Sequence, residues 1–70
     1  MKYYIVMHNK QFNTTKYKKN KCVDGWSTDK NKCWAFSKQG ALKIIERLKY
    51  AYRNNIANLE FYLEEAQGGK

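Results

Sequence analysis

A continuous run of apolar residues at the start of the chain predicts a β-strand, followed by a turn and a second strand. Residues 2–8 (KYYIVMH) carry aromatic and β-branched side chains on both faces, which is typical of a central strand. A turn is expected at residues 8–10, where the sequence becomes His-Asn-Lys. A second, more polar strand is expected to return from Phe12 to Tyr17.

A stripe of apolar residues at three- and four-residue steps predicts a helix from about Lys38 to Arg53. The stripe consists of Ala41, Ile44, Ile45, Leu48, Ala51 and Tyr52. Ser37 suits the N-cap position, because its hydroxyl can accept a hydrogen bond from an amide of the first turn. Asn54 and Asn55 are expected to end the helix, since Asn tolerates the left-handed conformation common there.

An alternating segment, residues 58–64, predicts a half-buried strand after the helix. Its apolar side chains Leu59, Phe61 and Leu63 share one face, and Glu60, Tyr62 and Glu64 share the other. The apolar face is expected to pack against the helix together with one face of the first strand.

Between the hairpin and the helix, turn signals alternate with short apolar stretches. Asp24-Gly25 favours a bend, residues 29–31 favour another, and residues 32–36 (KCWAF) predict a short strand. The predicted order is therefore β-β-(β)-α-β. It defines an α+β fold, a small antiparallel-rich sheet with one helix packed on a face, in a single domain over residues 1–70.

The charge is large and unevenly placed. The formal net charge is +8, and all but one of the 14 Lys and Arg residues lie in residues 1–57. Three of the six acidic residues lie in residues 58–70 instead. A body this basic attracts polyanions or an acidic protein.

Length and hydropathy limit the compartment and the assembly state. No stretch is long and apolar enough for a membrane span or a signal peptide, so we expect a cytoplasmic protein with Cys22 and Cys33 as free thiols. Seventy residues bury only a marginal core, which makes a homodimer the expected source of extra stability.

The most basic run, residues 16–21 (KYKKNK), is the first candidate binding site. It is too polar to be buried, and lysines on a mobile loop neutralise phosphates without choosing a sequence. Lys30 and Lys32 extend the patch, while Tyr17 and Trp26 offer rings on which bases could stack. The alternative is a solvated loop that only keeps the protein soluble.

The helix supplies a second candidate, a face with Lys43, Arg47 and Tyr50. The alternative is that these cations form surface pairs with neighbours such as Glu46. Residues 32–36 also match part of the RNP1 motif of RNA-recognition domains, although Trp34 and Phe36 are more often core residues in such a setting. The candidate nucleic-acid-binding residues are Lys16, Tyr17, Lys18, Lys19, Lys21, Trp26, Lys30, Lys32, Lys43 and Arg47.

Catalytic, metal and cofactor sites are not expected. Cysteine catalysis needs an oriented base, and His8 is the one histidine in the chain. No zinc-type spacing and no glycine-rich phosphate loop are present. Glu60 and Glu64 share a strand face roughly 13 Å apart, which is too far for paired acid–base work.

An initial KYYIV strand, a Trp-containing middle, WAFSKQGALKII leading into a helix and a final alternating strand resemble the small basic accessory proteins of large lytic bacteriophages. The resemblance implies host takeover or counter-defence in the host cytoplasm. Some such proteins bind RNA, including inhibitors of host endoribonuclease toxins. We therefore expect a nucleic-acid-binding protein, RNA preferred over DNA; the alternative is a protein–protein inhibitor that docks on an acidic host protein.

Overall fold

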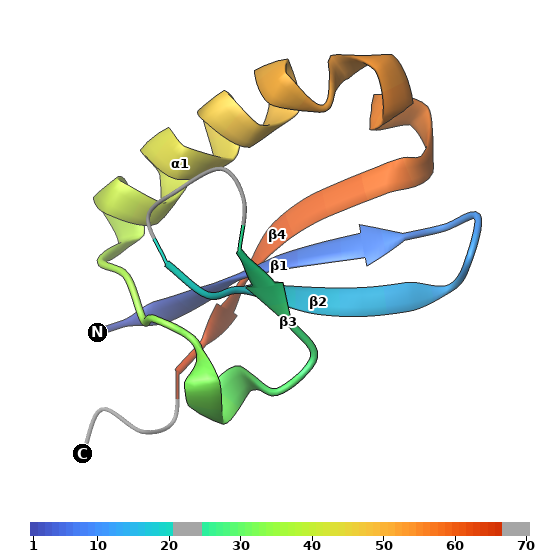
Figure 1. The fold of residues 1–70 in the computed structure, drawn as a ribbon. Helices are drawn as coiled ribbons and strands as arrows, with labels where there is room; N and C mark the ends of the chain where they lie inside the picture. The colour runs from blue at the N-terminus through green and yellow to red at the C-terminus, as the bar shows by residue number, and fades with distance from the viewer. Residues whose placement is uncertain (21–24, 67–70) are drawn as a thin grey trace.

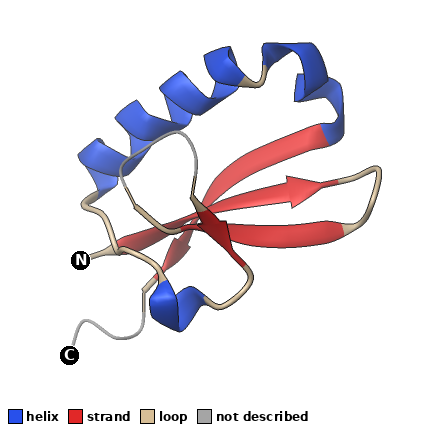
Figure 2. Cartoon of the chain, in the orientation of Figure 1, coloured by secondary structure: helices blue, strands red, loops and turns tan. Residues whose placement is uncertain are grey.

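The computed structural model describes residues 1–20 and 25–66 of the chain. One long helix lies across one face of a four-stranded antiparallel sheet of order β3-β2-β1-β4 (Figure 1). Figure 2 shows the same arrangement coloured by secondary structure. The elements are β1 (Tyr3–Asn9), β2 (Thr14–Lys18), β3 (Trp26–Ser27), the 3-10 helix η1 (Lys30–Lys32), α1 (Lys38–Ala51), the 3-10 helix η2 (Arg53–Asn58) and β4 (Leu59–Glu65). The predicted α+β class is confirmed.

β1 is a central strand, as its two apolar faces predict. It pairs with β4 along its whole length, from Tyr3 opposite Glu65 to Asn9 opposite Leu59, and with β2 from Val6 opposite Tyr17 onward. Asn9 stabilises the turn into β2. Its side-chain oxygen accepts hydrogen bonds from the backbone amides of Gln11 at 2.9 Å and Phe12 at 3.1 Å. β2 begins at Thr14, later than predicted, and continues to Lys18.

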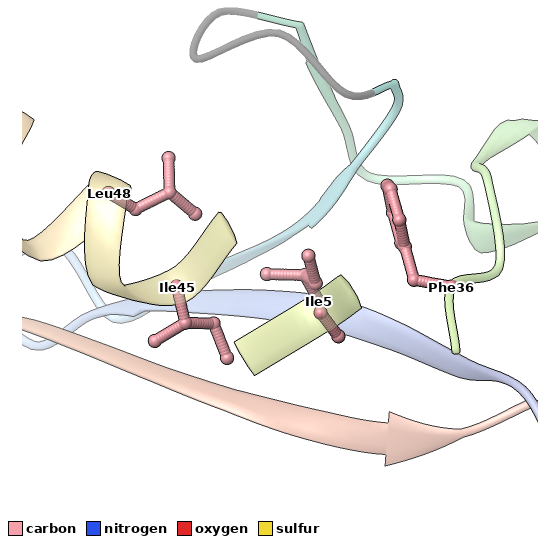
Figure 3. Close-up of a cluster of buried hydrophobic side chains, with 5 residues drawn as sticks. Ile5, Phe36, Ile45 and Leu48 are labelled. Atoms are coloured by element: carbon pink, nitrogen blue, oxygen red, sulfur yellow. The ribbon is translucent and has the colours of Figure 1, made fainter. Parts of the chain in front are cut away.

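The core lies between α1 and the sheet (Figure 3). Its buried members are Ile5, Phe36, Ala41, Ile45 and Leu48, with Trp26, Ile44, Tyr52, Phe61 and Leu63 packed around them. The predicted helix stripe and the predicted apolar face of β4 therefore meet. Ala51 is the exception in the stripe, since it is exposed.

Helix α1 begins where the sequence predicts and ends earlier. The hydroxyl of Ser37 accepts a hydrogen bond from the amide of Gly40 at 3.2 Å, which caps the first turn. Tyr52 leaves the helical conformation (φ −103°, ψ 22°), and its ring packs beside Phe61 at 6.0 Å between centroids. The prediction that Asn54-Asn55 ends the helix is wrong, because the chain continues through them as η2.

The strand predicted at residues 32–36 is not formed. Asp29 caps a 3-10 turn instead, its carboxylate accepting a hydrogen bond from the amide of Asn31 at 3.0 Å. Of this segment only Phe36 pairs with the sheet, in an isolated bridge to Tyr3 with both hydrogen bonds at 2.7 Å. The predicted bend at Asp24-Gly25 falls partly outside the described residues; Gly25 has the positive φ, 97°, that the prediction required.

Candidate nucleic-acid interface

The predicted basic run does not form one exposed loop. Lys16 and Lys18 belong to β2, while Lys19 follows the strand and is exposed. Lys21 lies outside the described residues. The run is therefore divided between a strand and the segment after it, and its lysines do not share one environment.

Lys18 contradicts the expectation that the run is too polar to be buried. Its exposed fraction is 0%, and it is opposite Trp26 in the pairing of β2 with β3. Its ammonium lies 4.8 Å from the centroid of the Trp26 ring and 3.4 Å from the carbonyl oxygen of Gly25. A charge held inside the fold on an aromatic face does not serve as an exposed phosphate contact.

The two aromatic residues predicted to stack on bases, Tyr17 within the run and Trp26 beside it, lie on opposite faces of the sheet. Trp26 packs under α1, where its indole N–H donates to the hydroxyl of Tyr52 at 3.2 Å. Tyr17 lies on the face away from α1, with its ring edge-on to Tyr4 at 6.2 Å between centroids. Trp26 is thus a core-packing residue, and Tyr17 is separated from the cations of α1 by the sheet.

Lys30 forms an ion pair with Glu64 of β4. Its ammonium lies 2.8 Å from a carboxylate oxygen of Glu64, and this hydrogen bond and charge raise the pKa of Lys30 above its ordinary value. Lys32 is exposed at the end of η1. The structure therefore does not bring these two lysines together with Lys43 and Arg47.

Lys43 and Arg47, by contrast, line a groove of about 490 Å³ between α1 and the segment that precedes it. We call it the Trp34 groove. Its lining residues are Lys2, Trp34, Ala35, Phe36, Ser37, Gly40, Lys43, Ile44 and Arg47. Trp34 is 56% exposed, whereas Phe36 is 4% exposed and forms part of the core. The expectation of a core role is wrong for Trp34 and right for Phe36.

Backbone pairing places the groove residues. The antiparallel bridge between Tyr3 and Phe36, with both hydrogen bonds 2.7 Å long, places Lys2 opposite Ser37. The amide of Trp34 donates to the carbonyl oxygen of Lys19 at 3.2 Å, which ties this part of the chain to the end of β2. On α1, Lys43 and Arg47 are one turn apart and therefore project from the same side of the helix.

The charged side chains that line the groove are all basic. Lys2, Lys43 and Arg47 are exposed cations in its lining, and none of its lining residues is acidic. Tyr50, predicted to share this helix face, is not part of the lining and stacks with the guanidinium of Arg53 at 4.4 Å. An anion with a flat aromatic group fits the groove chemically, because the cations can contact the charge while the indole stacks.

Trp34 and Lys2 line the groove but were not among the predicted binding residues. Trp34 had a signal, the partial RNP1 match over residues 32–36, but the match also fits a buried strand. Lys2 had none, because only the long-range bridge from Tyr3 to Phe36 brings it to the helix.

The residues considered for catalysis are held in other contacts. Nδ1 of His8 lies 2.9 Å from the hydroxyl oxygen of Thr15. Burial, followed by the charge of Asp29, raises the pKa of the Cys33 thiol and disfavours the nucleophilic thiolate. Among residues 1–20 and 25–66, no three His, Cys, Asp or Glu side chains gather as metal ligands do.

No protein-family model matches the chain, and no similar curated protein or solved structure was found. Within the described part of the chain, no helix is long and apolar enough to cross a membrane.

Proposed function

We propose that this protein binds nucleic acid, RNA in preference to DNA, and that the Trp34 groove is the contact surface. The observation that carries the proposal is the meeting of a 56% exposed indole with Lys2, Lys43 and Arg47 in one groove. Cations bind the phosphate backbone and release its counterions, and an aromatic ring stacks on an unpaired base. Unpaired bases are the usual target of RNA recognition, which supports RNA over DNA.

The biological setting we propose is that of a bacteriophage accessory protein in the host cytoplasm. By covering single-stranded RNA, the protein would keep a host defence nuclease or toxin from its substrate. The support is the resemblance in size, composition and element order, together with a site that suits binding rather than catalysis. His8, the base candidate, is in contact with Thr15, and the thiolate form of Cys33, the nucleophile candidate, is disfavoured because the pKa of its thiol is raised.

The salt dependence of RNA affinity tests the proposal. If three phosphates are contacted, the logarithm of the association constant should fall against the logarithm of salt concentration with a slope of roughly −2 on single strands. The double variant Lys43→Gln/Arg47→Gln should flatten that slope by about 1.4. Fluorescence anisotropy of a labelled single-stranded RNA measures both values.

A matched control removes the same charge from outside the groove. Lys10 and Lys49 are exposed and do not line it, so Lys10→Gln/Lys49→Gln should leave the slope close to that of the parent. Equal flattening by both double variants would mean that net charge rather than the groove controls binding. Failure of the parent to bind RNA or DNA at low salt would end the nucleic-acid proposal.

Trp34 separates stacking from charge. Trp34→Ala should weaken single-strand binding by about 1–3 kcal/mol, the range for loss of one stacked base, with the salt slope unchanged. Trp26→Phe is the control variant, because it also removes an indole, but Trp26 packs against the core and should not touch the RNA. Matching losses from the two variants would contradict a specific stacking role for Trp34.

The second candidate function is inhibition of an acidic host protein through the same groove. Trp and Arg dominate the energetic centres of protein interfaces, and Trp34 and Arg47 lie together in the lining. This candidate replaces the first if a host protein, and not nucleic acid, binds the parent and loses affinity for the Trp34→Ala variant.

We also propose that the protein is a homodimer. Large apolar side chains stay exposed on so small a fold, among them Phe12 at 69% and Ile56 at 39%. Burial of such surface between two copies is the ordinary source of stability that a small core lacks.

A further inference from the structure

The face of the sheet opposite α1 carries three tyrosines in a compact group, which we call the tyrosine face. Tyr17 on β2 and Tyr62 on β4 both lie opposite Val6 of β1, and Tyr4 is two residues from Val6 on the same face. Val6 is fully buried although it points away from α1, while Tyr62 is 45% exposed. The tyrosine rings therefore cover Val6 and form the outer surface themselves.

Carboxylates border the tyrosine face. Glu60 and Glu64 alternate with Tyr62 along β4 and project from the same side, because strand residues two apart share a face. This surface is thus acidic and aromatic in a chain whose net charge is +8. Phosphates are repelled by such a border, whereas cations are attracted both by the carboxylates and by the faces of the rings.

One cation already occupies this surface. The ammonium of Lys30 contacts Glu64 at 2.8 Å and lies 5.9 Å from the centroid of the Tyr17 ring. Lys30 belongs to η1, which comes after β3, the strand at the opposite edge of the sheet from β4 (Figure 1). The other end of the face, at Glu60, has no ion pair with any residue that the structure describes.

The main chain of β4 offers a second means of binding. β4 is the last strand in the order β3-β2-β1-β4, so no strand of residues 1–20 and 25–66 pairs with its outer side. An extended segment can add to such an edge through main-chain hydrogen bonds, with its alternate side chains meeting the face of the sheet. Glu60, Tyr62 and Glu64 occupy those alternate positions on β4.

We propose that the tyrosine face and the outer edge of β4 bind an extended, Lys- or Arg-bearing segment of a partner protein. The segment adds to β4 as a strand. Its basic side chains pair with Glu60 and Glu64 and lie over Tyr62, as Lys30 lies over Tyr17. This site is separate from the Trp34 groove, so one copy can hold nucleic acid and a basic protein together.

Binding of a defined peptide tests the proposal independently of RNA. The probe is a fluorescein-labelled peptide of about seven residues, a typical strand length, with alternating Arg and Thr. The matched probe has Glu in place of Arg. The parent should bind the first and not the second, and the amide NMR signals that shift should belong to residues of β4 and β1 rather than α1.

Variants on the face should change peptide affinity selectively. Glu60→Gln/Glu64→Gln should weaken binding roughly two- to thirtyfold, the range for two exposed ion pairs. Tyr62→Ser should weaken it as well. Glu46→Gln, which removes an exposed carboxylate of α1, and Lys43→Gln/Arg47→Gln in the groove should each leave peptide affinity unchanged.

Three results would overturn the proposal. Equal affinity of the Arg and Glu peptides would remove the electrostatic basis. A parent that binds neither peptide but changes from dimer to monomer in the Glu60→Gln/Glu64→Gln and Tyr62→Ser variants would assign the face to a second copy of the chain. A loss of single-stranded RNA binding in Tyr62→Ser, without a change in peptide binding, would assign the tyrosine rings to nucleic acid.

Discussion

At the scale of single residues, identical side chains in β2 have different roles because of their neighbours. Lys16 and Lys18 are two positions apart and project from the same face, yet Lys16 is exposed and Lys18 is fully buried. Lys18 is opposite Trp26 of β3, and its ammonium lies on that ring, whereas Lys16 is opposite Met7. The sequence does not distinguish the two lysines, because the indole that covers one of them comes from another strand.

Replacing these two lysines should separate their roles. Lys18→Ala removes both the buried aliphatic stem and a desolvated cation–π contact, and should lower the free energy of unfolding by about 2 kcal/mol. Lys16→Ala should change it by less than about 0.5 kcal/mol. Urea denaturation followed by circular dichroism measures both, and similar values for the two variants would contradict the burial of Lys18.

The buried stripe of α1 gives a second residue-scale prediction. Ile45 is 7% exposed and belongs to the core cluster with Ile5 and Leu48. Ile45→Ala should cost about 2–5 kcal/mol, as truncations in a packed core do, which is enough to unfold much of so small a domain. Lys43→Ala, on the exposed side of the same helix, should be nearly neutral; the reverse ranking would mean that the helix presents a different face to the sheet.

At the scale of elements, the start of α1 depends on one hydroxyl and one glycine. Ser37 caps the helix, and a Cβ at Gly40 would lie 3.1 Å from the Ser37 hydroxyl oxygen. Gly therefore leaves room for the cap at a position where Ala would otherwise favour the helix by roughly 1 kcal/mol. The same two residues line the Trp34 groove, so the cap also shapes that groove.

Ser37→Ala should lower the free energy of unfolding by about 1 kcal/mol through loss of the cap. Gly40→Ala in the parent should gain less than its helix propensity predicts, because the new methyl group crowds the hydroxyl. In the Ser37→Ala background that crowding is absent, so the full gain should appear. Thermal unfolding of the parent, the two single variants and the double variant forms a double-mutant cycle. Additive effects would show that Ser37 and Gly40 do not interact.

The elements that the sequence predicts well are those with a sustained period. β1, α1 and β4 follow from their apolar patterns and lie within two residues of the predicted bounds at each end. Residues 32–36 show the limit of such reasoning. Their apolar side chains fit a strand, but Asp29 and the bridge from Tyr3 to Phe36 hold them in a 3-10 turn and an extended segment. Contacts between distant parts of the chain decided the outcome there.

At the scale of the whole molecule, the basic charge is not spread evenly around the sheet. The helix side carries the Trp34 groove with three cations, and the opposite side carries the tyrosine face with Glu60 and Glu64. The candidate site could be predicted from sequence only in part: Lys43 and Arg47 share a helix face by period alone, while Trp34 and Lys2 join them through tertiary pairing. The long basic run does not line the Trp34 groove: Lys16 and Lys18 belong to β2, and Lys18 is buried.

A third surface lies at the end of the molecule where the β1–β2 turn and η2 meet (Figure 1). A groove of about 310 Å³ opens there between the two segments, lined among others by Met7, Phe12, Tyr52 and Leu59. Phe12 is 69% exposed beside this groove. Two copies related by a two-fold axis could each place a Phe12 ring in the groove of the other, since such an interface is self-complementary.

We therefore expect the homodimer to form at this end and to depend on Phe12. Light scattering at tens of micromolar should give the mass of a dimer for the parent and of a monomer for Phe12→Ser. Burial of a Phe side chain contributes about 1.5–3 kcal/mol, and the loss occurs twice in a two-fold dimer. Leu42→Ser is the control, because Leu42 is an exposed apolar residue on α1 away from this end, and it should leave the dimer intact. A monomeric parent would contradict the homodimer itself, whereas a dimeric Phe12→Ser variant would place the interface elsewhere on the molecule.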